Sequence, residues 1–331
     1  MICLGIESTA HSFGIGIVDE RGKVLANVYD MHRPAEGWGI HPMEAAKHHE
    51  SVKDVVLRKA LDEAGLRLED IGLVAFSQGP GLPPCLHKGL DFARQIAGKI
   101  SKPLIGVNHC VAHIEIGRLS SGLRDPITLY VSGANTQVLG FVSGRYRCFG
   151  ETMDIGIGNA LDKFGRGAGM GFPAGPRIEE LARNGRYVEL PYVVKGMDLS
   201  FSGIVTAALQ KLKKGDGLEN VCFSLQETLF AMLTEVTERA LAHTGKNEAL
   251  LTGGVAANSR LQQMLRIMCG ERGAKFAVVP RQFAGDCGAN ISWTGILAYR
   301  NGVKPLSKNE ANILPRWRTD DVEVPWLRAN T

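Results

Sequence analysis

Two histidines in one short segment have the spacing of metal ligands. His109 and His113 stand four positions apart in the segment NHCVAH. On a helix, residues four apart lie on one face about one turn apart, and two imidazoles placed in this way can share a metal ion. The same spacing also fits two histidines that cap or pack at a helix start, so the spacing alone leaves both interpretations open.

The sequence around this pair disfavours a metalloprotease. The H-E-x-x-H motif needs a glutamate directly after the first histidine, where it acts as general base on the metal-bound water. Cys110 occupies that position here, and Glu115 lies outside the pair. A metal site of another kind is therefore expected if the pair binds metal.

Glycine-rich turns indicate a nucleotide site of an unusual type. Neither G-x-x-x-x-G-K-[ST] nor G-x-G-x-x-G occurs among the 40 glycines, which excludes the P-loop and Rossmann devices. Polar or glycine turns instead follow three predicted strands, at residues 7–9, 132–135 and 252–258. Such turns present backbone N–H groups and hydroxyls to an anion, and the third also opens a helix. Each alone is an ordinary turn; together they predict a nucleotide site.

The elements that position these residues follow an α/β pattern. Residues 2–29 read as three strands joined by tight turns, and residues 127–152 repeat that pattern, which predicts a duplicated domain. Between the two, helices are expected at 41–65 and 87–100 and strands at 71–77 and 103–107. Asn108 is the expected N-cap of the helix that carries the histidine pair.

The second half predicts the same alternation of strands and helices. Helices are expected near 176–184 and 218–243, after a glycine-rich stretch at 156–175, and again after a strand at 248–252. A loop at 285–288 precedes a last helix at 291–300. Because Asp125-Pro126 marks a boundary, the expected domains are 1–124 and 125–295, and 296–331 is a C-terminal helix and tail returning to the first domain.

Composition fits a cytoplasmic enzyme. The net charge of 38 − 34 = +4 permits a nucleic-acid partner without requiring one. Seven cysteines without a C-x-x-C pair argue against a disulfide framework or a zinc knuckle and favour a reducing compartment. The N-terminus passes directly into a strand, and no apolar run is long enough for a membrane helix. No membrane association is expected.

Eight short motifs occur in order along the chain: IEST at 6–9, NHCVAH at 108–113, YVSG at 130–133, DIGIGNALDK at 154–163, FPAGP at 172–176, LSFSG at 199–203, TGGVAAN at 252–258 and GDCGAN at 285–290. Together they resemble one family, the tRNA N6-adenosine threonylcarbamoyltransferases (TsaD-type, in the archaeal and eukaryotic KEOPS form). The resemblance implies an α/β fold of two actin/Hsp70-like domains (ASKHA, RNase H-like) with a nucleotide and metal cleft between them.

The resemblance also implies the site residues. One divalent metal, iron or zinc rather than magnesium, is expected on His109, His113 and Asp286, with Tyr130 as a further ligand. The catalytic set is these two histidines, Asp286 and Glu7, the last a general-base candidate by its position alone. The expected substrate- and nucleotide-binding residues are Ser8, Thr9, Tyr130, Val131, Ser132, Gly133, Ala134, Asp162, Gly175, Glu179, Gly253, Gly254 and Asn258. Two positions depart from the family pattern: Ala134 replaces a usual glycine and His87 a frequent arginine.

The implied reaction moves a threonylcarbamoyl group from threonylcarbamoyl-AMP to N6 of adenosine 37 in tRNAs that read ANN codons, releasing AMP. ATP- or AMP-type nucleotides are expected to bind. The implied partners are tRNA and KEOPS subunits: a kinase-like ATPase, a small dimerising subunit and subunits that deliver tRNA. In some archaea the kinase follows in the same chain.

Three alternatives remain. An actin-fold kinase for a small molecule shares the phosphate turns but has no use for the histidine pair with Asp286. An ATP-dependent scaffold would work without the histidines. A metalloprotease is the least favoured, because of Cys110.

Overall fold

The computed structural model describes residues 1–33, 39–307 and 311–330, and the chain divides into two compact units. Unit 1 comprises Met1–Leu119, Val142–Tyr146 and Gly285–Thr331, and unit 2 comprises Ser120–Phe141 and Arg147–Ala284. The predicted domain boundaries at 124 and 295 stay predictions. By its contacts the stretch 285–295 belongs to unit 1.

Unit 1 contains a five-stranded sheet in the order β3-β2-β1-β4-β5. Strands β1 to β3 form the predicted antiparallel meander, and β4 and β5 add parallel strands beside β1. Because parallel strands need a crossover, helices connect them. The elements are β1 (Ile2–Glu7), β2 (Ser12–Asp19), β3 (Val24–Met31), α1 (Pro42–Ala64), η1 (Leu68–Asp70), β4 (Leu73–Gly79), α2 (Pro83–Ile100), β5 (Leu104–Asn108), α3 (His109–Ser121), α10 (Gly288–Arg300), η3 (Thr319–Asp321) and η4 (Pro325–Asn330).

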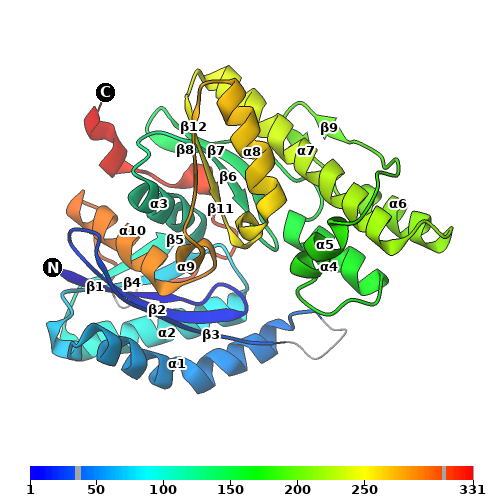
Figure 1. Cartoon of the computed structure of the whole chain (residues 1–331). Coiled ribbons are helices and arrows are strands. Elements are labelled where there is room, and N and C mark those ends of the chain that lie inside the picture. The colour runs from blue at the N-terminus through cyan, green and yellow to red at the C-terminus, as the bar shows by residue number, and fades with distance from the viewer. Residues whose placement is uncertain (34–38, 308–310, 331) are drawn as a thin grey trace. The chain divides into compact units, whose positions relative to one another are not determined.

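Helices cover both faces of this sheet: α1 and α2 pack on one face and α10 on the other (Figure 1). Glycines let α10 approach the strands closely. A Cβ on Gly5 would lie 2.3 Å from the Ser292 amide nitrogen, and one on Gly16 would lie 2.0 Å from that of Ala289. The opposite face packs Leu4, Ile6, Phe13 and Ile15 against α1 and α2 in a continuous apolar core.

Unit 2 contains a second sheet with the same strand order, β12-β11-β6-β7-β8. A meander of β6 to β8 is again joined by two parallel strands, β11 beside β6 and β12 beside β11. The predicted repeat is therefore confirmed at the level of topology. The elements are β6 (Ile127–Val131), β7 (Thr136–Val142), β8 (Arg145–Glu151), α4 (Ile157–Gly167), α5 (Gly175–Ala182), β9 (Val194–Lys195), β10 (Asp198–Leu199), α6 (Ser202–Lys213), α7 (Leu218–Thr244), β11 (Glu248–Thr252), η2 (Gly254–Ala257), α8 (Ser259–Glu271), β12 (Lys275–Val278) and α9 (Arg281–Ala284).

Several elements differ from the sequence prediction. Helix α2 begins at Pro83 rather than His87, since proline is tolerated in the first helical turn. Helix α4 lies within the glycine-rich stretch at 156–175, for which no helix was predicted. Helix α10 begins at Gly288, three residues before the predicted start, with Cys287 as its N-cap. Helix α6 and strand β12 were not predicted.

All seven cysteines are unpaired in the structure, as the sequence predicted. Within the described part of the chain, no helix is both long and apolar enough to cross a membrane.

Candidate metal centre and nucleotide-binding turns

The histidine pair lies at the start of α3, where the sequence placed it. Strand β5 ends at Asn108, whose side-chain oxygen accepts the Val111 amide at 3.1 Å and caps the helix. His109 and His113 then fall on one face, with their ring centroids 4.7 Å apart. Both residues are buried. The predicted N-cap and the predicted common face are therefore confirmed.

Asp286 reaches the histidines from the loop before α10. Its neighbour Cys287 caps that helix, and the Cys287 thiol contacts Asn290 Oδ1 at 3.1 Å. Asn290 also donates to the Gly285 carbonyl at 3.3 Å, so it contacts the loop on both sides of Asp286. The docking of α10 on Gly5 and Gly16 fixes this loop relative to the sheet.

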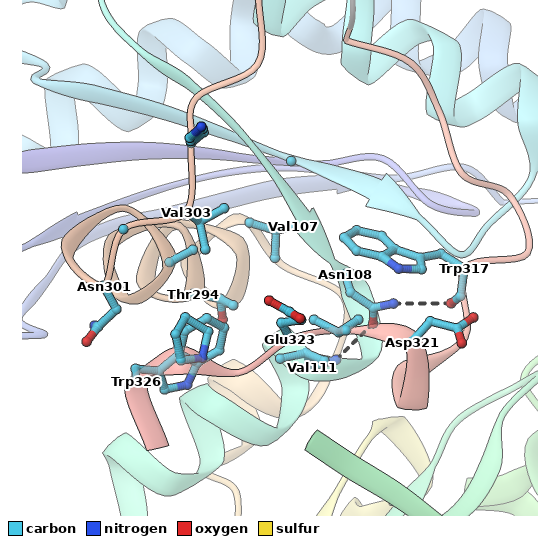
Figure 2. Close-up of a pocket in the computed structure, with 16 residues that line it drawn as sticks. Val107, Asn108, Val111, Thr294, Asn301, Val303, Trp317, Asp321, Glu323 and Trp326 are labelled. Carbon is cyan, nitrogen blue, oxygen red and sulfur yellow. Dashed lines mark hydrogen bonds between the residues drawn. The ribbon is translucent and has the colours of Figure 1, made fainter. Parts of the chain in front are cut away.

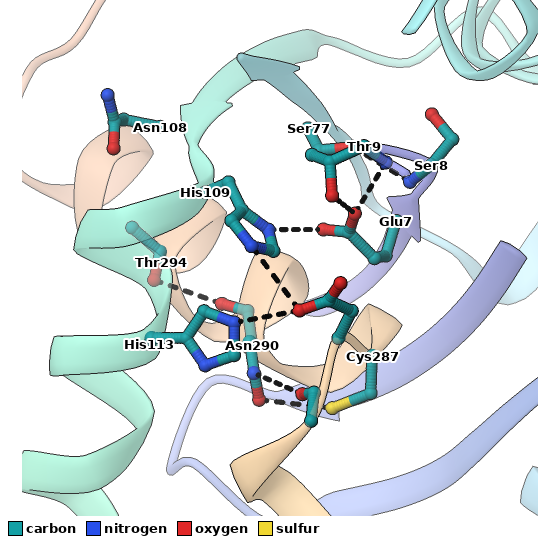
Figure 3. A network of polar contacts seen from close by, with 12 residues as sticks. Glu7, Ser8, Thr9, Ser77, Asn108, His109, His113, Cys287, Asn290 and Thr294 are labelled. Atoms are coloured by element: carbon teal, nitrogen blue, oxygen red, sulfur yellow. Dashed lines mark hydrogen bonds and ion pairs between the residues drawn. The ribbon is translucent and has the colours of Figure 1, made fainter. Parts of the chain in front are cut away.

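The three side chains meet with the separations of metal ligands (Figure 3). Asp286 Oδ1 lies 3.4 Å from His109 Nε2 and 3.2 Å from His113 Nε2. Two ligands at metal bonds of about 2.1 Å in tetrahedral geometry lie about 3.4 Å apart. The Asp286 side chain keeps 20% of its surface exposed, so the centre is reachable from solvent. The donor set of two imidazoles and a carboxylate fits one divalent metal ion.

Glu7 determines which nitrogen of His109 can bind a metal. Glu7 Oε2 lies 2.9 Å from His109 Nδ1, and its other oxygen accepts the Thr9 amide at 2.7 Å and the Thr9 hydroxyl at 2.6 Å. If Nδ1–H donates to Glu7, the neutral ring places its lone pair on Nε2, facing Asp286. A lone pair opposite a carboxylate is an arrangement that a cation stabilises. Carboxylates commonly orient metal-binding histidines in this way.

The electrostatics of the centre favour the protonation states that a metal needs. Burial alone would raise the pKa of Asp286, but His109 and His113 outweigh it and hold that pKa well below its usual range. Burial lowers the pKa of His113 despite its hydrogen bond with Asp286. The Asp286 carboxylate is therefore ionised and the His113 imidazole tends to be neutral, and these are forms that bind a cation.

The turn at residues 7–9 is engaged within unit 1. The Ser8 amide donates to Ser77 Oγ at 2.9 Å, and the Thr9 amide donates to Glu7. The Ser8 hydroxyl has no hydrogen-bond partner among the described residues. The predicted nucleotide contacts of Ser8 and Thr9 stay predictions. Ser77 is a supporting residue that sequence reasoning missed, because no local motif links it to position 8.

The second predicted turn lies in unit 2 at the end of β6. Tyr130 and Val131 end this buried strand, and the Ser132 hydroxyl accepts the Asn135 amide at 3.1 Å. The exposed amides of Gly133 and Ala134 have no acceptor within the described part of the chain, as an anion-binding turn requires. Ala134 does not have a positive φ, so its replacement of glycine causes no backbone strain.

Asp162 and Glu179, which were also predicted to bind the nucleotide, accept hydrogen bonds from backbone amides in unit 2. Asp162 Oδ1 accepts the Ala174 amide at 2.7 Å, just before Gly175 opens α5. Glu179 on α5 accepts the Ser259 amide at 2.9 Å. These contacts join α4, α5 and the start of α8 into one network.

The third turn in unit 2 is shaped by Gly253. This residue has φ +97°, and a Cβ there would lie 2.2 Å from the Val131 carbonyl oxygen. The exposed Gly254 follows. Asn258 caps α8 by accepting the amides of residues 260 and 261. The strand ends that carry the second and third turns are thus in direct contact.

Two residues that the sequence analysis named, Tyr130 and His87, are not part of the cluster of His109, His113 and Asp286. Tyr130 belongs to unit 2, so its expected role as a metal ligand stays a prediction. His87 is exposed on α2. Asn290, which supports the Asp286 loop, was not singled out, although its spacing of three from Cys287 is the signal that could have identified it.

Comparison with known proteins identifies the family of the chain. The family model for tRNA N6-adenosine threonylcarbamoyltransferase (TsaD) matches residues 22–293. An enzyme of that name from Thermococcus kodakarensis is 56% identical over 328 residues, covering 98% of this chain and 100% of the relative. A probable bifunctional tRNA threonylcarbamoyladenosine biosynthesis protein from Methanobrevibacter smithii is 54% identical, and the match covers all of this chain but 61% of the relative.

Solved structures confirm the fold class. Full-length HypF in a phosphate- and nucleotide-bound form has a TM-score of 0.64 at 12% identity, covering 92% of this chain and 56% of that one. Component A of (R)-2-hydroxyglutaryl-CoA dehydratase from Acidaminococcus fermentans has a TM-score of 0.54 at 12% identity, covering 89% of this chain and 98% of that one. Both are actin-like proteins, so the predicted actin-like α/β class is confirmed. By its family match and its close relatives, the chain belongs to the tRNA N6-adenosine threonylcarbamoyltransferases.

Proposed function

We propose that this chain transfers a threonylcarbamoyl group from threonylcarbamoyl-AMP to N6 of adenosine 37 in tRNAs that read ANN codons, releasing AMP. Membership of the family supports the reaction. The chain spans the full length of the Thermococcus relative but 61% of the bifunctional one. The activity of the whole protein is therefore part of this proposal.

In this proposal His109, His113 and Asp286 hold one divalent metal ion, iron or zinc. When bound, the ion polarises the carbamoyl carbonyl and neutralises charge that develops during transfer. Glu7 orients His109, since both of its oxygens already accept hydrogen bonds. This assigns Glu7 a positioning role in place of the general-base role expected from its position.

The residues of unit 2 bind the nucleotide in this proposal. The exposed amides of Gly133 and Ala134 receive a phosphate, as does the turn at Gly253 and Gly254. Asp162, Glu179 and Asn258 are the further nucleotide-binding residues of this proposal. They contact the start of α5 or of α8, and the carboxylates of Asp162 and Glu179 can accept hydrogen bonds from ribose hydroxyls. The target adenosine flips out of its stack to present its amine, and alignment of the two substrates supplies much of the rate.

The proposed partners follow from the resemblance to the family. The protein acts on tRNA in the cytoplasm together with KEOPS subunits, which include a kinase-like ATPase, a dimerising subunit and subunits that deliver tRNA. A net charge of +4 is small for an enzyme that holds tRNA alone, and this favours tRNA binding shared among subunits.

The observation that carries the proposal is the cluster of His109, His113 and Asp286 with Glu7 behind it. A small-molecule kinase or an ATP-dependent scaffold has no need for two imidazoles and a carboxylate at metal-ligand separations. A protease has no glutamate beside His109 to activate water.

Transfer of labelled threonine to unmodified tRNA tests the proposal. The assay contains bicarbonate, ATP, a threonylcarbamoyl-AMP synthase and the KEOPS partners. We expect metal-dependent labelling by the wild type and its loss in the His109→Ala/His113→Ala variant, while the matched control His87→Ala keeps full activity. Nucleotide binding without any transfer by the wild type would favour the kinase or scaffold. Full activity of the double variant would disprove the metal assignment.

A further inference from the structure

A second site lies in unit 1, in a cavity of about 420 Å³. Its walls come from the start of α3, from α10 and from the C-terminal segment around η3 and η4 (Figure 2). None of the three proposed metal ligands lines it. This volume lies within the range of ligand pockets, so a nucleoside-sized molecule fits.

The walls of the cavity suit a flat, largely apolar ring. Val107, Val111 and Val303 line it together with the indoles of Trp317 and Trp326. Figure 2 shows Trp317 next to Asn108, and Trp326 on the other side of Val111. Indole faces bind planar rings by stacking, and nucleobases in particular stack on aromatic side chains.

Asn108 offers a hydrogen-bond donor and an acceptor side by side at this cavity. Its side chain is 2% exposed. Oδ1 accepts the Val111 amide and Nδ2 donates to the Trp317 carbonyl, each at 3.1 Å. A side-chain amide has two N–H groups and two acceptor lone pairs, so one of each remains within the described part of the chain. The two existing bonds also fix which end of the amide is the donor.

Trp326 supplies a second buried donor. Its Nε1 is buried and has no acceptor among the residues that the structure describes, although a buried indole N–H usually has one. Asp321 lines the same cavity and is exposed, where its carboxylate can accept hydroxyl groups. The cavity thus presents stacking faces, two fixed donors, one fixed acceptor and two carboxylates, since Glu323 also lines it.

We propose that this cavity binds an adenine base. Adenine places an amino donor beside a ring-nitrogen acceptor, and this pattern is the one that an asparagine amide reads with two bonds. A further ring nitrogen receives the Trp326 N–H, and the ribose hydroxyls lie at the Asp321 side. The base belongs to a free adenine nucleoside or nucleotide or to an unpaired adenosine of an RNA. Because Asn108 also caps α3 next to His109, an occupied cavity stiffens the first turn of the metal-binding helix.

Photolabelling identifies the site separately from the nucleotide turns of unit 2. Full-length protein is irradiated with 8-azidoadenosine, and in a second arm with a single-stranded RNA that carries this nucleotide, and the labelled segment is mapped by mass spectrometry. We expect label in residues 317–326. Adenosine should protect that segment roughly tenfold better than inosine, because the 6-oxo group of inosine removes the amino donor.

Variants of the cavity give matched tests. Trp326→Phe keeps a ring but loses the N–H, and Val303→Phe fills the cavity without touching a polar group, so both should reduce labelling of 317–326 by about fivefold or more. Trp293→Phe, at a tryptophan of α10 that does not line the cavity, should not change it. Label from the free nucleoside identifies a nucleotide site, and label from the RNA alone identifies an RNA base. No label in this segment in either arm, equal protection by inosine, or undiminished labelling of Val303→Phe would overturn the proposal.

Discussion

Replacing Glu7 by glutamine should weaken metal binding without changing the shape of the site. Three donors converge on the Glu7 carboxylate: His109 Nδ1–H, the Thr9 amide and the Thr9 hydroxyl. A glutamine has one acceptor oxygen. If that oxygen faces Thr9, the amide N–H groups face Nδ1, and His109 must carry its proton on Nε2, where it blocks the metal. If the oxygen faces His109, the Thr9 amide loses its acceptor.

The size of the effect follows from the burial of the contact. Loss of the partner behind a metal-binding histidine typically reduces metal affinity by 10- to 100-fold, which corresponds to about 1.4 to 2.7 kcal/mol at 1.36 kcal/mol per tenfold change. Glu7 is 1% exposed, so water cannot replace the lost bond. We therefore expect the upper half of this range.

Competition between the protein and a chromogenic chelator for Zn²⁺ measures the change. The dissociation constant should rise by about 30- to 100-fold in Glu7→Gln. The control Glu69→Gln, at an exposed glutamate of η1, should stay within about twofold of the wild type, because a surface carboxylate far from the site contributes little. An unchanged affinity in a normally folded Glu7→Gln protein would refute the argument that Glu7 orients His109.

Three further predictions concern stability. Burial, and then the neighbouring His48, lowers the pKa of His49 to about 4. Because the unfolded state binds this proton more readily, the stability that neutral His49 contributes should be fully present above pH 6.5 and should fall towards pH 4. The melting temperature of His49→Gln should fall less over the same pH range. Hydrogen bonds from Phe201 and Ser202 outweigh the effect of burial and lower the pKa of Asp154 to about 2. Asp154→Asn should therefore melt at a lower temperature than the wild type above pH 4. A difference in melting temperature that stays the same down to pH 2 would contradict the prediction that ionised Asp154 stabilises the fold. Gly16→Ala should lower the free energy of unfolding in urea by about 1–3 kcal/mol or more through overpacking against α10, whereas Gly203→Ala, with open space around it, should not.

Local patterns in the sequence predicted the parts of the structure that depend on neighbouring residues. Alternating strands and tight turns identified both meanders, and Asn108 before two histidines four apart identified the cap and common face of α3. These features need no knowledge of distant segments. Helix α4, in the glycine-rich stretch, was not predicted, because glycine is unfavourable in helix interiors. In the structure, Gly158 instead allows close contact with Ser132 and Gly133.

Features set by distant contacts could not be predicted from local patterns. Asp286 lies 173 residues after His113 and joins it only because α10 packs on the glycine faces of β1 and β2. Its place in the metal centre came from resemblance to a family. The hydrogen bond between Glu7 and His109 joins residues that are 102 apart in the sequence, so no local pattern could show it. The position of Glu7 at the end of β1 therefore predicted a general base, whereas its contact with His109 indicates a positioning residue.

The central claim is that one metal ion on His109, His113 and Asp286 is needed for threonylcarbamoyl transfer. Metal-free protein is titrated with Zn²⁺ or Fe²⁺ in the presence of the partner subunits, and threonylcarbamoyladenosine in the tRNA is measured by mass spectrometry. Product formation should rise in proportion to occupancy and level off at one equivalent, and Asp286→Asn should need far more metal. Full modification of tRNA by protein that holds no metal would contradict the account.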